Sequence, residues 1–194
     1  DYGYDKASNV TGMLERLPLD AMREALQAFT PDKEKRIRIF FLGDYSETVR
    51  GDEKWVKTFD WKPIELVGTK LADSLEDWKD ALATIDADFI LVSNYREIRA
   101  NPESADMVPP EELIKITLES TKIPVIGANS FFIADGGMLA VATSALEIGE
   151  VPAKMALDIL EGKKSPGELP VQISRHFVVA VDGGKVAQRR FPLA

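Results

Sequence analysis

Short apolar segments alternate with amphipathic helical segments along most of this chain, and this alternation restricts the fold more than any other feature. The clearest apolar segment is Phe89-Ile90-Leu91-Val92, an unbroken run typical of a strand buried on both faces of a sheet. No two predicted strands are joined by a hairpin turn. The order therefore predicts an α/β fold with a doubly wound parallel sheet, arranged in three layers as α/β/α.

Helix-start signals and hydrophobic periodicity bound the predicted elements. Pro18 precedes the first helix, and Ser46 and Ser74 stand where helix N-caps are expected. The predicted strands are 37–42, 64–67, 89–92 and 123–126, and the predicted helices are 19–29, 47–57, 74–85 and 109–118. A long helix at 147–160 ends before Gly162, and β segments are predicted at 171–174 and 177–181.

Composition argues against several classes of function. The chain has 194 residues and a net charge of −8, and its basic residues are scattered, so a nucleic-acid partner is not expected. It has no cysteine, which excludes disulfides and Cys-ligated metals, and its single histidine, His176, is interpreted as a surface residue. We find no nucleophile elbow, phosphate loop or metal-ligand pattern, and we predict no cofactor, metal or catalytic residue.

Polar turns follow two of the predicted strands closely. Ser46 and Glu47 come after the strand 37–42, and Asn94 and Tyr95 come after 89–92. Because the carboxyl ends of parallel strands meet at one edge of a sheet, these four residues are candidate ligand contacts. The alternatives are a helix cap for Ser46 and Glu47 and a simple turn for Asn94 and Tyr95.

A third polar turn follows the strand 123–126. Asn129 and Ser130 offer a turn whose backbone N–H groups can receive a carboxylate, and Phe131 offers a ring that can stack on an aromatic ligand. The alternative is that Phe131 and Phe132 belong to the hydrophobic core. All three residues are therefore candidate ligand contacts with a structural alternative.

Several short pieces of sequence, in their order and spacing, resemble one family. The pieces are Asn9-Val10-Thr11-Gly12, Lys122 to Gly127, Gly137-Met138-Leu139-Ala140, Glu147-Ile148-Gly149, Ile159 to Gly162 and Leu169-Pro170-Val171. The resemblance is to ABC-transporter substrate-binding proteins of the periplasmic-binding-protein-like type I, among them transport components that include aromatic amino-acid binders. It covers nearly the whole chain.

The resemblance implies two lobes joined by hinge strands, with a ligand held in the cleft between them. It makes residues 1–18 a lead-in and first hinge crossing, 19–127 lobe two, and 128–194 the return segment with the helix and strands of lobe one. Asn9, Thr11 and Gly12 are then candidate hinge residues. The first half of lobe one is absent on this interpretation, which leaves the apolar face of the 147–160 helix available for a homodimer contact.

The function that the resemblance implies is that of a non-catalytic solute-binding component of an ABC transporter. The ligand is expected to be a small molecule, with an amino acid among the candidates, and the partner is a membrane permease. The location is expected to be periplasmic or otherwise extracytoplasmic, with a lipid anchor conceivable in the full-length protein. The alternatives are an extracytoplasmic ligand-sensing domain of a signalling protein and, third, an enzyme built on the same sheet.

Overall fold

The computed structural model describes residues 7–30 and 35–188, which form two compact units. One unit holds residues 7–18 and 143–177, and the other holds 19–142 and 178–188. The chain therefore passes between the units after residues 18, 142 and 177. The sequence places a lobe boundary at 127/128 instead, fifteen residues before the division that the structure shows at 142/143.

The larger unit is built on a six-stranded sheet with the strand order β3-β2-β4-β5-β6-β8. Neighbouring strands from β3 to β6 are paired in parallel. The last pair is antiparallel, because Ser144 N donates to His176 O at one end and Asp182 N donates to Met138 O at the other. The strands are β2 (Arg38–Asp44), β3 (Glu65–Ala72), β4 (Phe89–Val92), β5 (Val125–Gly127), β6 (Leu139–Thr143) and β8 (Phe177–Val181).

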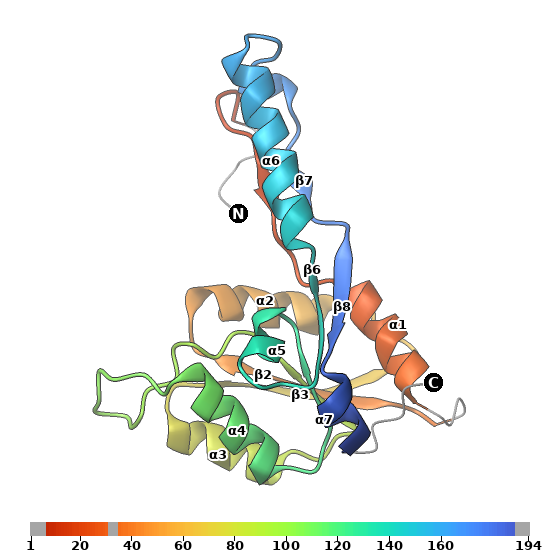
Figure 1. Cartoon of the computed structure of the whole chain (residues 1–194), viewed down its shortest axis with the longest axis vertical. Helices are drawn as coiled ribbons and strands as arrows, with labels where there is room; N and C mark the ends of the chain where they lie inside the picture. The colour runs from red at the N-terminus through yellow and green to blue at the C-terminus, as the bar shows by residue number, and fades with distance from the viewer. Residues whose placement is uncertain (1–6, 31–34, 189–194) are drawn as a thin grey trace. The chain divides into compact units, whose positions relative to one another are not determined.

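Helices cover both faces of this sheet, which confirms the predicted α/β class. In Figure 1, α1 and α2 lie above the strands, and α3 and α4 lie below them. Strand β2 shows why both faces are apolar: Leu42 packs with Trp78 and Leu113 of one layer, whereas Ile39 and Phe41 alternate onto the other. The helices of this unit are α1 (Leu19–Phe29), α2 (Glu47–Thr58), α3 (Leu75–Thr84), α4 (Pro110–Ser120), α5 (Phe131–Ala134) and α7 (Gly183–Gln188).

The sheet continues beyond β5, the strand predicted at 123–126. The strand at 123–126 is the last one that the sequence assigns to lobe two, and ending the sheet there is wrong, because β6 and β8 follow it at the same edge. The missed strand β6 contains Ala140 and Ala142, both fully or almost fully buried. Alanine has little β propensity, so the segment gives a weak strand signal although its burial makes it part of the core.

The smaller unit contains one long helix and a short parallel strand pair. Helix α6 (Ala145–Leu160) begins where Ser144 accepts a hydrogen bond from Glu147 N, and β1 (Met13–Leu14) pairs with β7 (Gln172–Ile173). The 3-10 helix η2 (Pro166–Glu168) precedes β7. Met155 is the one buried residue of α6 among the described residues, and Leu160 is 82% exposed. No observation supports the homodimer predicted through residues 147–160.

The predicted hinge residues lie in the smaller unit, just before β1. The Thr11 hydroxyl donates to Leu169 O over 2.7 Å, and Gly12 O accepts a hydrogen bond from Gln172 N over 2.9 Å. Asn9 is exposed in a turn. These contacts attach the lead-in segment to the segment around β7, and the hinge role of the three residues stays a prediction.

Candidate functional site at the carboxyl edge of the sheet

A buried carboxylate joins two of the loops at the carboxyl edge of the sheet. Asp44, the last residue of β2, is fully buried, and it accepts hydrogen bonds from Ser46 N at 3.1 Å and Ser46 Oγ at 2.5 Å. It also accepts one from Glu97 N at 3.1 Å, and its own N–H donates to Asn94 O at 2.8 Å. Asp44 therefore fixes the loop after β2 against the loop after β4, a role that the sequence analysis did not detect.

Ser46 serves as the N-cap of α2, as the structural alternative predicts. Its Oγ accepts a hydrogen bond from Val49 N over 3.4 Å while it donates to Asp44, and the side chain is buried. Glu47 is exposed in the first turn, where the helix dipole favours a carboxylate. The exposed aromatic side chain at this strand end is Tyr45, with the Arg50 guanidinium carbon 5.4 Å from its ring centroid.

Tyr95 is fully buried, and its hydroxyl donates a 2.6 Å hydrogen bond to Asp135 Oδ2. Burial raises the pKa of Tyr95 far above its usual value, and the hydrogen bond to the Asp135 carboxylate raises that pKa further. The ring makes edge contacts with Phe131 at 5.7 Å and with Phe132 at 6.2 Å between centroids. Tyr95 is thus a neutral hydrogen-bond donor that holds the loop in place.

Arg96 stands beside Tyr95 and contacts the same carboxylate from the surface. Its Nη2 donates to Asp135 Oδ2 over 2.8 Å, and its guanidinium carbon lies 4.5 Å from the centroid of the Phe131 ring. The Arg96 side chain is 43% exposed, whereas that of Asp135 is only 7% exposed. Sequence reasoning missed both residues, although Arg96 directly follows a predicted contact and Asp135 opens the Gly136-Gly137 turn.

Two glycines allow the Phe132 side chain to pack closely in the turn after β5. A Cβ atom added to Gly127 would lie 2.4 Å from the Phe132 side chain, and one added to Gly137 would lie 2.1 Å from it, so only glycine fits at either position. Phe132 is fully buried, as the core alternative predicts for it, whereas Phe131 is half-buried. The turn therefore leaves one aromatic ring partly open beside Arg96.

Asn94, Asn129 and Ser130 complete this edge of the sheet. The Asn94 Oδ1 atom accepts a 3.0 Å hydrogen bond from Tyr95 N, which leaves the amide N–H groups of its side chain for another partner. Asn129 and Ser130 precede α5, and their backbone carbonyls accept hydrogen bonds from Phe132 N and Ile133 N, both at 3.2 Å. Asn94 and Asn129 follow the adjacent strands β4 and β5.

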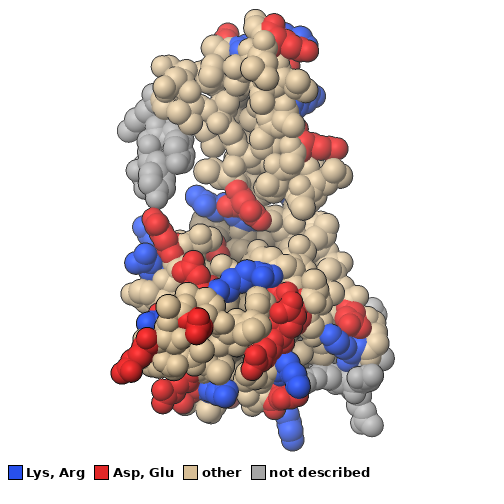
Figure 2. Space-filling view, turned by 60° about the vertical axis from the view of Figure 1, so that its left-hand side comes forward, with Lys and Arg blue, Asp and Glu red and all other residues tan. Residues whose placement is uncertain are grey.

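The predicted site residues are therefore divided between the two units. Ser46, Glu47, Asn94, Tyr95, Asn129, Ser130 and Phe131 all lie in the unit with the six-stranded sheet, whereas Asn9, Thr11 and Gly12 lie in the other. On the face seen in Figure 2, acidic and basic side chains are interspersed over the larger unit. Ligand contact by each of the seven remains a prediction.

A groove also lies on this unit, beside α4. It has a volume of about 320 Å³ and is lined by residues of α4, of the turn between α5 and β6, and of α7. Asp135 belongs both to this lining and to the cluster with Tyr95 and Arg96.

Two further properties follow from the residues that the structure describes. Within ranges 7–30 and 35–188, no group of three or more His, Cys, Asp or Glu side chains is arranged to hold a metal ion. Over the same part of the chain, no helix combines the length and the apolar character needed to cross a membrane.

One family model matches almost the whole chain. It is described as "ABC transporter substrate binding protein" and covers residues 3–189. No curated protein matches the sequence of the chain.

Three solved structures share the fold at low sequence identity. A conserved domain protein from Vibrio cholerae is 24% identical with a TM-score of 0.64, over 94% of this chain and 58% of that one. An ABC domain in complex with L-Trp from Streptococcus pneumonia is 17% identical with a TM-score of 0.66, over 98% and 63%. A ligand-free, open substrate-binding protein with adhesive properties from Clostridium difficile is 19% identical with a TM-score of 0.68, over 97% and 62%.

The three TM-scores show a common fold, which confirms the periplasmic-binding-protein-like architecture. The chain spans roughly three fifths of the length of each of the three proteins, between 58% and 63%. What the three proteins share with this chain is thus an arrangement of strands and helices.

Proposed function

We propose, on the premise that this chain belongs to the ABC transporter substrate binding protein family, that it binds a small solute for a transporter and catalyses no reaction. The partner is then a membrane permease, and the location is extracytoplasmic, as is usual for this family. Because the chain spans roughly three fifths of its solved relatives, the ligand, partner and location of the whole protein are all part of this proposal.

The ligand class that the carboxyl edge of the sheet fits best is an amino acid. The observation that carries this proposal is the Arg96 guanidinium, held by Asp135 at 2.8 Å and lying 4.5 Å from the Phe131 ring centroid. An arginine has five N–H donors in a fixed fork, so a single contact with Asp135 leaves donors for a ligand carboxylate. The half-exposed Phe131 ring offers an apolar face beside that charge.

Polar groups on the adjacent strand ends suit the rest of such a ligand. The side-chain N–H groups of Asn94 have no hydrogen-bond partner among the described residues. The Asn129 side chain brings both a donor and an acceptor to the neighbouring strand end. A ligand ammonium needs an acceptor, and its carboxylate needs a donor, so these amides complement Arg96. This favours direct contacts by Asn94, Asn129, Ser130 and Phe131, while Tyr95 and Ser46 support the loops that carry them.

A non-catalytic role agrees with the hydrogen bonds at this edge. The raised pKa of Tyr95 keeps its hydroxyl protonated at neutral pH, so it acts as a donor and not as a base. The Asp44 carboxylate is fully buried and saturated by backbone and hydroxyl donors. Both residues position loops, which is what a binding site requires.

Thermal shift and titration calorimetry test this proposal. The chain is heated with L-Trp, L-Tyr, L-Phe or, as a control without a zwitterion, glucose. L-Trp comes first because the Streptococcus protein is complexed with it. A ligand at a hundred times its dissociation constant adds about 2.7 kcal/mol of stability. If none of the three amino acids raises the unfolding temperature, the amino-acid proposal is wrong.

Two arginine variants show whether binding occurs at this edge. Arg96→Gln is expected to weaken amino-acid binding by about tenfold or more, because a charge-assisted contact is lost. Arg36→Gln is the matched control, since Arg36 is exposed and forms its ion pair with Glu65, at the start of β3 and away from the carboxyl edge. Equal affinities of the two variants would place the ligand elsewhere.

A further inference from the structure

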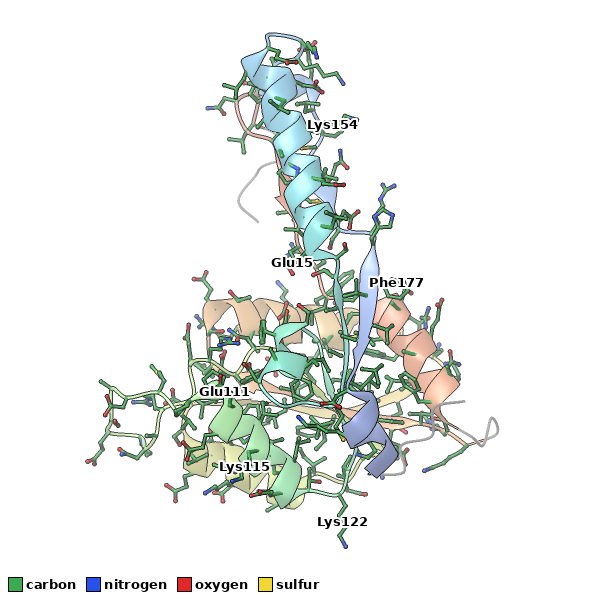
Figure 3. The ribbon with its side chains drawn as sticks, in the orientation of Figure 1. Glu15, Glu111, Lys115, Lys122, Lys154 and Phe177 are labelled. Atoms are coloured by element: carbon green, nitrogen blue, oxygen red, sulfur yellow. The ribbon has the colours of Figure 1, made fainter. Side chains whose placement is uncertain are left out.

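The groove beside α4 is large enough for a small ligand of its own. Its volume of about 320 Å³ corresponds to about ten water-sized groups, at roughly 30 Å³ each. Figure 3 shows Glu111 and Lys115 on α4, which forms one wall of the groove. This wall runs along the helix from its first turn to Glu119, so the groove extends beyond the strand ends along the flank of the sheet.

The α4 wall presents a row of charges of alternating sign. Glu111, Lys115 and Glu119 are spaced by four residues, so their side chains lie on one face of the helix. Such spacing commonly gives intrahelical ion pairs, yet across the described residues no hydrogen bond or ion pair is found for the Lys115 ammonium or the Glu119 carboxylate. Both groups are therefore available to a ligand.

The two charged groups of the groove that lie outside α4, Asp135 and Lys185, already have partners within the protein. The Lys185 Nζ donates to Gly136 O over 2.9 Å and lies 3.6 Å from Asp182. The Asp135 carboxylate accepts hydrogen bonds from Tyr95 and Arg96. A ligand in this groove consequently finds its polar partners on α4, while Leu118 supplies apolar surface.

From this arrangement we propose a second ligand site, in the groove, for a small zwitterion with an aliphatic side chain. The carboxylate of such an aliphatic α-amino acid pairs with Lys115, its ammonium pairs with Glu111 or Glu119, and its side chain contacts Leu118. A plain anion would meet two carboxylates beside the lysine, and a plain cation would meet the lysine, so the alternating row favours a molecule with both charges. The polar contacts proposed for this site lie on α4, whereas those of the proposed transport ligand lie at the strand ends.

Backbone NMR titration of the 194-residue chain with L-leucine tests the proposal. L-leucine is expected to shift the amide signals of Lys115, Glu119, Gly136 and Met138. Two matched probes each lack one charge: 4-methylpentanoate has no ammonium, and 3-methylbutylamine has no carboxylate. Both are expected to bind more weakly than L-leucine by about tenfold.

Two lysine variants separate this site from general surface binding. Lys115→Gln is expected to weaken L-leucine binding by about tenfold. Lys54→Gln, at an exposed position on α2 away from the groove, is expected to bind as the unaltered chain does.

Four results would overturn the proposal. The first is that the groove signals do not move up to about 10 mM L-leucine. The second and third are that Lys115→Gln binds L-leucine as the unaltered chain does, and that 4-methylpentanoate binds as tightly as L-leucine. The fourth is that the shifts are confined to Asn94 and Asn129. The last result would still support the proposed function at the strand ends, so the two proposals fail separately.

Discussion

The hydroxyl of Tyr95 donates a 2.6 Å hydrogen bond to the carboxylate of Asp135, which lies forty residues further along the chain. This bond joins the loop after β4 to the turn before β6, and Arg96 shares the same carboxylate oxygen at 2.8 Å. Because Asp135 is nearly buried, these two donors replace hydrogen bonds that its carboxylate would otherwise make with water. The geometry of the candidate site thus depends on a contact between distant segments.

Replacing Tyr95 with phenylalanine tests the importance of that bond. Tyr95→Phe keeps the aromatic contacts with Phe131 and Phe132 and removes one donor from a buried carboxylate, so a loss of about 1–3 kcal/mol in unfolding free energy is expected. Urea denaturation measures it. Tyr45→Phe is the control, since Tyr45 is 57% exposed, and equal losses in the two variants would contradict this explanation.

Alanine at Gly137 tests the close packing of the turn after α5. A Cβ atom there would lie 2.1 Å from the Phe132 ring, so Gly137→Ala is expected to destabilise the chain by about 1–3 kcal/mol. In Gly51→Ala the new methyl group meets no atom within 4 Å inside α2, and that variant is expected to gain up to about 1 kcal/mol. A neutral Gly137→Ala variant in thermal unfolding would show that Phe132 can move aside.

Removing the Asp44 carboxylate tests the joint between the loops after β2 and β4. Asp44→Ala leaves the N–H of Glu97 and the N–H and hydroxyl of Ser46 without their acceptor in a buried place, and we expect a loss of about 2–4 kcal/mol. Ser46→Ala removes only the helix cap and one donor, with an expected loss of about 1 kcal/mol. The order of the two losses in denaturant unfolding is decisive, and a greater loss for Ser46→Ala would refute the role given to Asp44.

Acid titration tests the carboxylate of Asp88 at the opposite edge of the sheet. Burial alone raises its pKa, but hydrogen bonds from Lys35 and from the backbone N–H of Arg38, with the positive charges of both residues, lower the pKa below its usual 3.8 overall. Since the folded-state pKa is the lower one, this stabilisation is present above pH 3.8 and is lost as the pH falls through the folded-state value. Asp88→Asn is therefore expected to destabilise the chain at pH 7, and this effect is expected to shrink as the pH falls through the folded-state pKa of Asp88.

The measurement for Asp88 is the difference in unfolding temperature between Asp88→Asn and the unaltered chain at a series of pH values. Asp60→Asn serves as the control, because Asp60 is an exposed aspartate for which no pair with a basic side chain is found in the described part of the chain. A difference for Asp88→Asn that is constant across the acid range would show that the charge is unimportant there.

Local sequence signals were enough for most elements of the fold. Helix α1 at Leu19–Phe29 and strand β4 at Phe89–Val92 have the bounds that hydrophobic periodicity and apolar content predict, because both depend on residues close together in the chain. Ser46 and Ser74 cap α2 and α3 as their positions indicate. The α/β class and the family resemblance follow from the order of such pieces.

The tertiary structure alone decided how the sheet ends and what the site contains. Strand β6 is rich in alanine and its partner β8 comes about forty residues later, so neither its presence nor its pairing has a local signal. Likewise, nothing near Asp135 in the sequence indicates Tyr95 or Arg96. The sequence by itself determined which residues stand at the strand ends, whereas their partners depend on long-range contacts that only the folded chain brings together.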